Sequence, residues 1–395
     1  MIGSTSYPRV CFIATGLARN GAETQLFHAA CGLRSYGFDV HVVSILSSDY
    51  YGARLEEEGV PLTCLDASRT THPVRILSRF LRHVKRLGPV AVVGFNYPGS
   101  MLARAGGTLA RVPIVISSIR TENFGSAWRR RALAWTDSWA TVTTTNSYAV
   151  ARKLVDAGAA SKGRVRVIPN GLDLEAVGPH LRRERAAIRE SLGVGEKDFL
   201  WVAAGRFEEP KDYPNLLTAV ALLAKSSTPL KLAIAGHGPL QDAVRNEVAA
   251  LGLGDSVSLL GQRDDVTACM AAADATVLAS AWESSPNVVI ESLAVGTPVV
   301  CTDVGGVREI VLHGSSGLIV QPRDSAALAV AMSTLMGCSE HERRRMGAVG
   351  RKHIEDNFAL DRFLGNWSGL LNELVSQQEG APRNNQFDEK RSGRQ

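Results

Sequence analysis

Short apolar segments alternate with helical patterns along the chain, and this alternation occurs twice. The segments are rich in Val, Ile, Leu and Ala and end at glycine or polar residues, as buried parallel strands do. We predict strands over 10–14, 40–45, 90–94, 112–117 and 140–144 in the first half, and over 199–204, 230–235, 257–260, 275–278, 298–301 and 317–320 in the second. Strands that alternate with helices favour doubly wound parallel sheets. We therefore predict an α/β protein with two Rossmann-like domains that face each other across a cleft.

The domain boundaries follow from where the pattern stops and restarts. We expect a hinge near residues 171–195, which includes a charged helical pattern from Arg182 to Leu192. The predicted units are an N-terminal Rossmann-like domain over 1–178, a C-terminal Rossmann-like domain over 179–358, a helix over 359–377 that crosses back to the N-terminal domain, and a disordered tail over 378–395. Ligands of such sheets bind outside the carboxyl ends of the strands, so we expect the chemistry in the cleft.

Composition indicates an ordinary globular chain, with 45% hydrophobic and 21% charged residues among 395. No apolar run reaches the ~18 residues of a membrane span, and residues 1–9 lack the basic and apolar order of a secretion signal. We therefore expect a cytoplasmic protein. The cysteines lack metal-type spacing and are interpreted as buried thiols; they are Cys11, Cys31, Cys64, Cys269, Cys301 and Cys338.

The segment from Glu283 to Glu291 carries the densest group of polar residues after a predicted strand. Pro286 suits the first turn of a helix, and we expect that helix over 287–294. Its free N–H groups and positive dipole end would attract phosphate, and both carboxylates could accept hydrogen bonds from sugar hydroxyls. The alternative is purely structural: Ser284 or Ser285 caps the helix, and the acids stabilise its start.

A second polar segment, Gly205 to Asp212, also follows a strand and supplies two cations. Arg206 could bind phosphate oxygens in a fork and Lys211 as a point charge. Together they could neutralise a departing diphosphate without a metal. A solvated basic loop is the alternative.

The order of these segments resembles a known family. The segments are Asn20-Gly21-Ala22-Glu23, Ile168-Pro169-Asn170-Gly171, Gly205-Arg206…Lys211, Ala235-Gly236-His237-Gly238, Gly261-Gln262-Arg263-Asp264-Asp265-Val266, Glu283…Glu291, Gly296-Thr297-Pro298-Val299-Val300 and Gly305-Gly306-Val307-Arg308-Glu309. The chain is similar, over about residues 9–370, to the family-four retaining glycosyltransferases (glycosyl transferases group 1) of the GT-B fold. The match is more specific in the second half than in the first.

The resemblance implies that the C-terminal domain, 179–358, binds a nucleotide-diphosphate sugar as donor and that the N-terminal domain, 1–178, binds the acceptor. Arg206 and Lys211 would hold the diphosphate and stabilise its departure, Glu283 would contact sugar hydroxyls, and Glu291 would hold the ribose. Further donor-site residues would be Gly21, Arg263, Ser285, Asn287 and Val288. Glu283, Arg206 and Lys211 would take part in catalysis. Gly21 would allow close approach of the first-domain loop.

The expected reaction moves a hexose-type sugar to a saccharide or lipid-linked acceptor with retention, in synthesis of cell-surface polysaccharide or glycolipid. The second half has no Asp-x-Asp pair of the sort that holds a donor-bound metal, so we expect no metal and no cofactor beyond the nucleotide sugar. Two alternatives remain: a nucleotide-sugar isomerase or hydrolase of the same fold, and a two-lobed binding protein without catalysis.

The first domain departs from the family pattern after the strand near 114–117. Many members carry a His there, whereas this chain has Ser118-Ile119-Arg120-Thr121-Glu122-Asn123 and resembles a subgroup with Arg. Arg120 could hold the acceptor or the sugar, and Glu122 could act as a base. A structural salt bridge is the alternative.

The basic charge of the first half suggests an anionic partner. Residues 1–175 contain 21 Lys and Arg against 12 Asp and Glu, a net +9, whereas the remainder has a net −4. Residues 74–87 show apolar positions at 74, 77, 81, 84 and 87 among five basic residues, and Trp128 precedes three arginines. Basic amphipathic segments bind anionic membranes, so we expect peripheral contact with the inner face of the cytoplasmic membrane. A helix packed on the sheet with a solvated basic face is the alternative. No groove-reading motif accompanies the charge, so nucleic acid is not expected.

Overall fold

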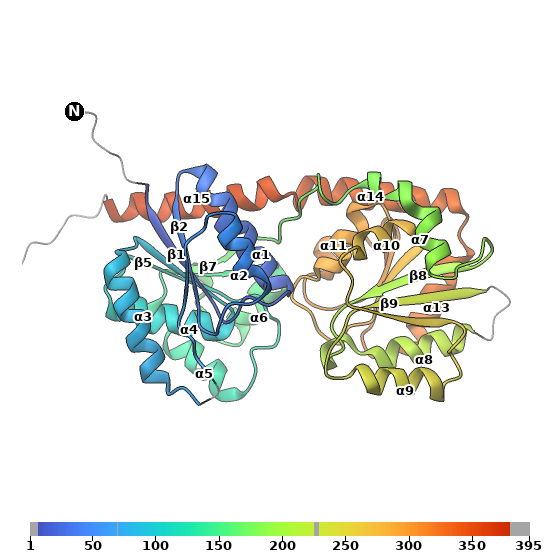
Figure 1. The fold of residues 1–395 in the computed structure, drawn as a ribbon, viewed down its shortest axis with the longest axis horizontal. Coiled ribbons are helices and arrows are strands. Elements are labelled where there is room, and N and C mark those ends of the chain that lie inside the picture. Colours follow the sequence, from blue (N-terminus) through green and yellow to red (C-terminus); the bar gives the residue numbers. More distant parts are fainter. Residues whose placement is uncertain (1–6, 69, 225–228, 380–395) are drawn as a thin grey trace, which may run out of the picture.

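The computed structural model of the protein describes residues 7–68, 70–224 and 229–379. Two α/β domains lie side by side, each built on a parallel sheet with helices on both faces (Figure 1). The predicted fold class, two Rossmann-like doubly wound domains, is confirmed.

The first sheet has seven parallel strands in the order β3-β2-β1-β4-β5-β6-β7. Their bounds are β1 Arg9–Ala14, β2 Asp39–Ser44, β3 Leu62–Cys64, β4 Ala91–Phe95, β5 Ile114–Ser118, β6 Val142–Thr145 and β7 Val165–Val167. The two edge strands, β3 and β7, were not predicted. Each has three residues and none of them is fully buried, so they lack the apolar run that marks a central strand.

The helices of the first domain connect these strands and cover both faces of the sheet. They are α1 Gly21–Gly32, α2 Tyr50–Glu57, α3 Pro73–Leu87, α4 Asn96–Leu109, α5 Ala127–Trp135 and α6 Tyr148–Asp156. The chain continues from α1 into a 3₁₀ helix, Leu33–Tyr36. It ends at Gly37, whose φ of 82° is in the left-handed region that glycine adopts readily.

The second sheet contains all six strands that the sequence predicts, in the order β10-β9-β8-β11-β12-β13. They are β8 Phe199–Ala204, β9 Leu230–Ala235, β10 Val257–Gly261, β11 Ala275–Leu278, β12 Val299–Thr302 and β13 Gly317–Val320. Because these strands are short, apolar and bounded by small residues, the pattern located them within one or two residues.

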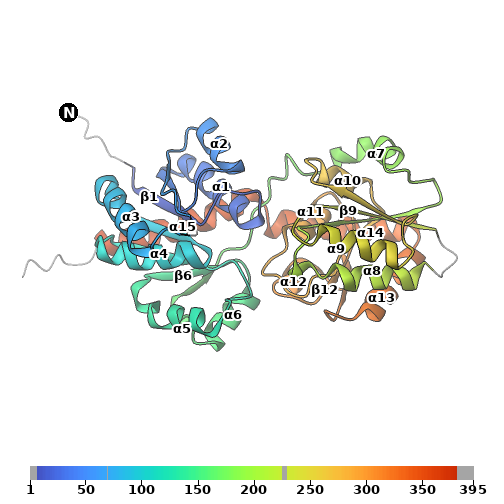
Figure 2. The same cartoon turned by 60° about the horizontal axis from the view of Figure 1, so that its bottom comes forward.

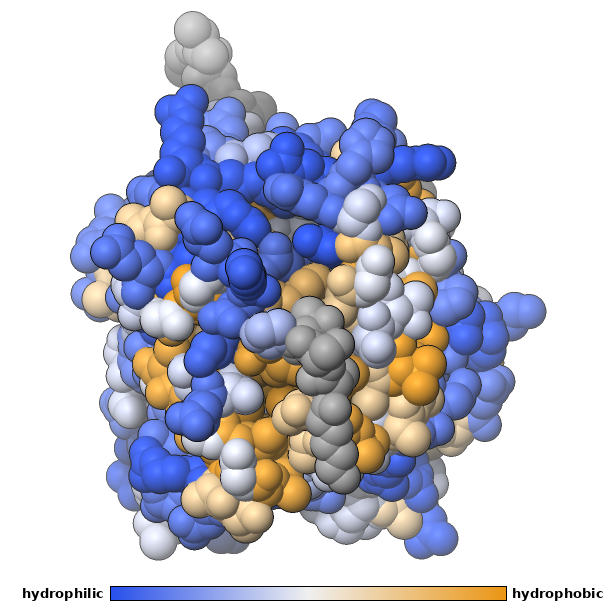
Figure 3. Space-filling view, turned by 90° about the vertical axis from the view of Figure 1, so that its right-hand side faces the viewer, coloured by the Kyte–Doolittle hydropathy of each residue, from blue (hydrophilic) through white to orange (hydrophobic). Residues whose placement is uncertain are grey.

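The helices of the second domain follow the same strand–helix alternation. They are α7 Arg185–Ser191, α8 Tyr213–Leu223, α9 Gln241–Ala250, α10 Val266–Ala272, α11 Asn287–Ala294, α12 Val307–Ile310, α13 Ser325–Gly337 and α14 Glu340–Asn357. The predicted helix over 182–192 is shorter, because a 3₁₀ helix, Pro179–Glu184, precedes α7. Figure 3 views the outer end of this domain, where hydrophilic residues dominate the upper part and apolar residues gather lower down.

The last helix, α15 Leu360–Glu379, leaves the second domain and lies along the first (Figures 1 and 2). Trp367 is fully buried there against Phe12 and Phe95. Residues 378 and 379 are helical, so the predicted disordered tail does not begin at 378. The rest of that prediction, residues 380–395, lies outside the described residues.

Two expectations about burial are only partly confirmed. Cys31, Cys64 and Cys338 are only partly buried, although the other three cysteines are buried as expected. The apolar stripe of α3 is also different: Val74 is exposed by 65%, whereas Phe80 is fully buried. The helix faces the sheet through Ile76, Leu77, Phe80, Val84 and Leu87.

Candidate functional site

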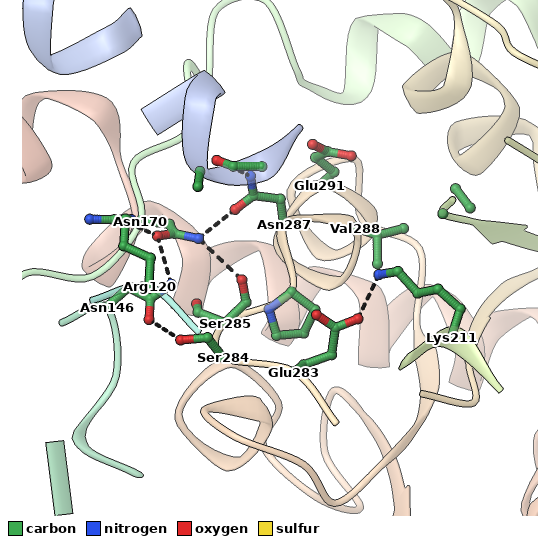
Figure 4. A pocket seen from close by; sticks show the side chains of 15 residues that line it. Arg120, Asn146, Asn170, Lys211, Glu283, Ser284, Ser285, Asn287, Val288 and Glu291 are labelled. Carbon is green, nitrogen blue, oxygen red and sulfur yellow. Dashed lines mark hydrogen bonds and ion pairs between the residues drawn. The ribbon is translucent and has the colours of Figure 1, made fainter. Parts of the chain in front are cut away.

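A cavity of about 360 Å³ lies between the two domains, where strand ends from both sheets meet. It is lined by Gly21, Ala22, Arg120, Asn146, Asn170, Ala204, Gly205, Lys211, Glu283, Ser284, Ser285, Pro286, Asn287, Val288 and Glu291. Of the residues predicted for the donor site, seven line this cavity and two, Arg206 and Arg263, do not. Figure 4 shows its lining side chains.

The start of α11 forms one wall of the cavity. Pro286 is the N-cap, and no side chain caps the helix. The structural alternative, in which Ser284 or Ser285 caps it, is therefore wrong. The hydroxyl of Ser284 instead donates to Asn146 in the first domain. The uncapped N–H groups and the positive dipole end face the cavity and suit an oxyanion.

Lys211 and Glu283, which also line the cavity, form a salt bridge. The Lys211 Nζ atom lies 2.5 Å from Glu283 Oε1, and both side chains are mostly buried. Ser280 also donates to Glu283 Oε1, at 3.0 Å. Gly205, at the end of β8, has a φ of 157°, and a Cβ there would lie 2.9 Å from the Lys211 side chain. Glycine at this position therefore allows Lys211 to lie over the strand end.

Glu291 lies one turn into α11 and lines both this cavity and a neighbouring one. Burial raises the pKa of Glu291, and the charges of Arg19 and Lys211 oppose the rise. A carboxylate with this environment is suited to accept hydrogen bonds from neutral hydroxyls in a partly desolvated pocket.

Asn170 connects the two domains at the base of the cavity. Its side-chain nitrogen donates to Asn287 Oδ1 at 2.6 Å and to the Ser285 carbonyl at 3.1 Å. Its side-chain oxygen accepts from Arg120. Asn287 in turn donates to the carbonyl of Gly21, at 3.5 Å. This chain of amides joins the first-domain glycine loop to the start of α11.

Arg206 and Arg263 lie at a neighbouring cavity of about 330 Å³, which shares Gly21, Asn287 and Glu291 with the first. Arg206 pairs with Glu208 at 2.8 Å. Arg263 makes a two-pronged pair with Asp265, at 2.7 and 2.6 Å, which raises its pKa. Arg206 and Arg263 therefore line the neighbouring cavity, and each forms a salt bridge with an acidic side chain, Glu208 or Asp265.

The pair Arg120 and Glu122 does not form a salt bridge. Glu122 pairs with Lys153, which agrees with the structural alternative for this residue. Arg120 is only 6% exposed and has Asn170 as its hydrogen-bond acceptor. Burial without a facing carboxylate lowers the pKa of Arg120 to about 9. Both residues line a third cavity of about 560 Å³ on the first-domain side.

Several residues of the site were missed by the sequence prediction because they act across the interface. Asn20 accepts from Arg206 at 3.2 Å, and Arg19 pairs with Asp264. Glu309 caps the first-domain helix α6, since its carboxylate accepts from the backbone of Tyr148 and Ala149 at 3.0 and 2.9 Å. Asn20, Asn170 and Glu309 belong to segments that resemble the family, which is the signal that could have found them.

Two kinds of feature are absent from the part of the chain that the structure describes. No group of three or more His, Cys, Asp or Glu side chains is arranged to hold a metal ion there. In the same ranges, no helix combines the length and the apolar character needed to cross a membrane.

Comparison with known proteins assigns both domains to one family. Residues 20–171 match the "Glycosyl transferase 4-like domain" and residues 184–353 match "Glycosyl transferases group 1". With the two facing Rossmann-like domains and the cavity between them, these matches define the class. The chain belongs to the group 1, family-four glycosyltransferases of the GT-B fold.

The relatives that match are diverse. The chain is 34% identical over 218 residues to the D-inositol 3-phosphate glycosyltransferase of Nocardia farcinica, covering 53% of this chain and 47% of the relative. It is 24% identical over 368 residues to the sulfoquinovosyl transferase SQD2 of Arabidopsis thaliana, covering 88% and 68%. The chain thus spans about half the length of most curated relatives that it matches. HepE of Anabaena, solved with UDP-glucose, has the same fold, with a TM-score of 0.78 at 19% identity over 92% of this chain and 99% of that one.

Proposed function

We propose that the protein transfers a hexose-type sugar from a nucleotide-diphosphate donor to a saccharide or lipid-linked acceptor. The observation that carries the proposal is the interdomain cavity in which Lys211, Glu283 and Glu291 gather at the uncapped start of α11. A cation and helix N–H groups suit a diphosphate, and two carboxylates suit sugar and ribose hydroxyls.

The donor would lie across the two cavities that share Gly21, Asn287 and Glu291. Lys211 and the start of α11 would hold the diphosphate, with Arg206 at the rim. Glu283 would accept from sugar hydroxyls and Glu291 from the ribose. The backbone from Ser285 to Val288 would meet phosphate and sugar, and Arg263 would lie on the side of the base.

The anomeric configuration would be retained, as the family resemblance implies, through attack on the face from which the diphosphate departs. Charge on the departing diphosphate is stabilised by fixed cations and N–H groups, and such preorganised electrostatics supply much of the rate in comparable reactions. Closure of the two domains would exclude water, which otherwise hydrolyses the donor.

The transfer would be independent of a metal ion. Support comes from the two cations, Lys211 and Arg206, which can balance the diphosphate charge, and from the missing Asp-x-Asp pair in the second half. The protein would then keep its activity in excess chelator.

The acceptor would be a saccharide or a lipid-linked sugar, in synthesis of polysaccharide or glycolipid. Relatives include proteins named as a D-inositol 3-phosphate glycosyltransferase, a sulfoquinovosyl transferase and an exopolysaccharide phosphotransferase. A lipid-linked acceptor would require contact with a membrane surface. The face of α5 offers one, since Trp128 and Trp135 are exposed by 61% and 79% beside Arg129, Arg130 and Arg131. Tryptophan and arginine together suit an anionic interface.

The test is a panel of nucleotide sugars, measured by thermal shift and by hydrolysis in the presence of excess chelator. We expect one donor to raise the melting temperature by mass action and to be hydrolysed slowly without a divalent ion. Folded protein that neither binds nor consumes any nucleotide sugar would overturn the function. Activity that chelator abolishes and a divalent ion restores would overturn the metal-free mechanism only.

A further inference from the structure

The third cavity, of about 560 Å³, adjoins the donor cavity and opens on the first-domain side. It shares Arg120, Lys211 and Glu283 with the donor cavity, and it extends to Tyr97 and Arg129. A molecule in this cavity would therefore lie next to the donor sugar. Its position, size and continuity with the donor cavity fit an acceptor site.

The acidic side chains of this cavity are all balanced. Glu122 pairs with Lys153, Glu208 with Arg206 and Glu283 with Lys211. Burial raises the pKa of the fourth, Glu23, and the nearby charge of Arg206 opposes the rise. None of these carboxylates leaves a negative charge without a cation beside it.

The cations of the cavity are not all balanced. Arg120 is 6% exposed, and its Nε and Nη1 atoms are buried without a hydrogen-bond partner among the described residues. Its one acceptor is the neutral amide of Asn170. Buried cations are ordinarily paired. The guanidinium carbon of Arg120 lies 5.5 Å from the centre of the Phe95 ring, but among the described residues no carboxylate pairs with it.

Arg129 is the second cation of the cavity without an acid partner among the described residues, and unlike Arg120 it is exposed. It lies over the rings of Tyr97 and Trp128, with distances of 5.1 and 5.5 Å from its central carbon to the ring centres. Within the described ranges it makes no ion pair or hydrogen bond through its side chain. The two rings fix the guanidinium plane and leave its N–H groups free for a ligand.

We propose that the acceptor carries an anionic group, a phosphate or a carboxylate, that is held by Arg120 and Arg129. The inference rests on the proposed function, because it assumes that the neighbouring cavity holds the donor. The donor diphosphate is a less suitable partner for Arg129, which lines the third cavity and not the donor cavity. Arginine suits the group because its planar fork matches both anions.

The experiment measures the binding of small anions to protein saturated with the nucleoside diphosphate of its donor, which fills the diphosphate subsite. The probes are inorganic phosphate, malonate and glucose 6-phosphate, with glucose as the neutral reference, titrated by calorimetry. We expect at least one anion to bind and glucose 6-phosphate to bind at least about ten-fold more tightly than glucose, as charged hydrogen bonds predict.

The variants separate a specific contact from general charge. R129Q should reduce the preference for anions by about ten-fold, whereas R130Q, an exposed neighbour on α5 outside the cavity, should leave it unchanged. R120K should weaken anion binding although it keeps the positive charge. Arg120 is buried, so if the R120K variant does not fold, the comparison of R129Q with R130Q tests the proposal. Equal binding of glucose and all three anions, or equal effects of R129Q and R130Q, would overturn the proposal.

A third arm asks whether the anion belongs to the donor. Hydrolysis of a neutral nucleotide sugar is compared with that of its uronic-acid counterpart in R129Q and in unchanged protein. If R129Q lowers the use of the uronic-acid donor alone, the anion is on the donor and the acceptor assignment is wrong. If no nucleoside diphosphate binds, the proposed function is wrong. If a nucleoside diphosphate binds but the protein shows no preference for anions, only the acceptor proposal is wrong.

Discussion

The ammonium nitrogen of Lys211 lies 2.5 Å from Oε1 of Glu283, and both residues line the interdomain cavity. The cation expected to hold diphosphate and the carboxylate expected to hold sugar hydroxyls are thus direct partners. A donor diphosphate must compete with Glu283 for Lys211, and the sugar must reach the carboxylate beside it. The pair therefore couples the two halves of donor recognition.

Replacement of Lys211 by alanine should lower kcat/KM for the donor by about 2–4 kcal/mol of transition-state stabilisation, which is roughly 30- to 1000-fold. The reason is the loss of a fixed charge beside the departing diphosphate. Steady-state transfer or donor hydrolysis measures the effect, with circular dichroism as a check on folding. Lys197→Ala, an exposed lysine of the same domain, is the control. A folded Lys211 variant with unchanged rates would remove it from the site.

Glu283→Gln should separate the two roles of the pair. Lys211 loses its carboxylate partner, so binding of the nucleoside diphosphate alone should be kept or become tighter. Turnover of the full nucleotide sugar should fall, because the amide is a weaker acceptor for sugar hydroxyls than a carboxylate. Calorimetry with the diphosphate and kinetics with the donor test this. If the variant loses diphosphate binding and donor turnover to the same extent, Glu283 acts only by positioning Lys211.

Glu291→Gln should weaken donor binding and at the same time stabilise the fold at neutral and alkaline pH. Burial raises the pKa of Glu291, so the folded state holds its proton more tightly than the unfolded state does. Its contribution to stability is therefore fully present below the ordinary carboxyl range and is lost as pH rises through the higher folded value. Urea unfolding at pH 5 and pH 8 measures this effect. The free energy of unfolding should decrease less from pH 5 to pH 8 in the Glu291→Gln variant than in the unchanged protein. An equal decrease in both proteins would contradict the effect of burial.

The second-domain half of the site was predictable because its determinants are local. The six strands and α11 follow from apolar runs bounded by small residues, and Lys211, Glu283 and Glu291 each follow a strand end or helix start in the sequence. The first-domain half was not predictable in this way. Contacts such as Asn170 with Asn287 and Glu309 with α6 depend on how two separate sheets face each other, which no periodicity within one segment encodes.

The prediction for α3 was right at Leu77, Val84 and Leu87 but wrong at Val74. Counting apolar positions from Val74 gave a stripe with the expected helical spacing, yet Val74 is exposed and Phe80 is fully buried. The helix turns its Phe80 side to the sheet because that position meets Gly106 of α4, where a larger residue would collide with the ring. The ring of Phe80 fits against Gly106 of α4, and the sequence of α3 alone does not show this partner.

Glu309 should stabilise the observed docking of the domains through the start of α6. Its carboxylate accepts from two backbone N–H groups across the cleft, at 3.0 and 2.9 Å. Glu309→Ala should cost about 1 kcal/mol of this docking, as the loss of a helix cap does, and should lower turnover several-fold. Small-angle scattering would show a larger radius of gyration. Arg308→Ala, which removes an exposed surface pair with Asp303, is the control and should leave both quantities unchanged.

Contact with an anionic membrane should depend on α5 more than on α3. Trp128 and Trp135 are exposed beside three arginines, whereas the apolar side of α3 is packed on the sheet. Sedimentation with phosphatidylglycerol vesicles should show binding at low salt that decreases at high salt. A Trp128→Ala, Trp135→Ala double variant should lose it, and an Arg82→Gln, Arg86→Gln double variant on α3 should keep most of it. If the unchanged protein does not bind the vesicles, the proposal of membrane contact is wrong. If the α3 variant loses binding and the α5 variant keeps it, α3 is the contact surface.

The final helix should be essential to the stability of the first domain, although it follows the second domain in the chain. Trp367 of α15 is fully buried, with its ring centre 6.0 Å from that of Phe12 and 6.2 Å from that of Phe95. Trp367→Ala should lower the free energy of unfolding by about 3–5 kcal/mol, the usual cost of removing a large buried aromatic side chain. Glu373→Ala, an exposed position on the same helix, should change it by less than about 0.5 kcal/mol. Urea unfolding followed by circular dichroism measures both variants. If Trp367→Ala unfolds like Glu373→Ala, α15 does not complete the first core, and truncation of the chain before Leu360 would then leave that domain folded.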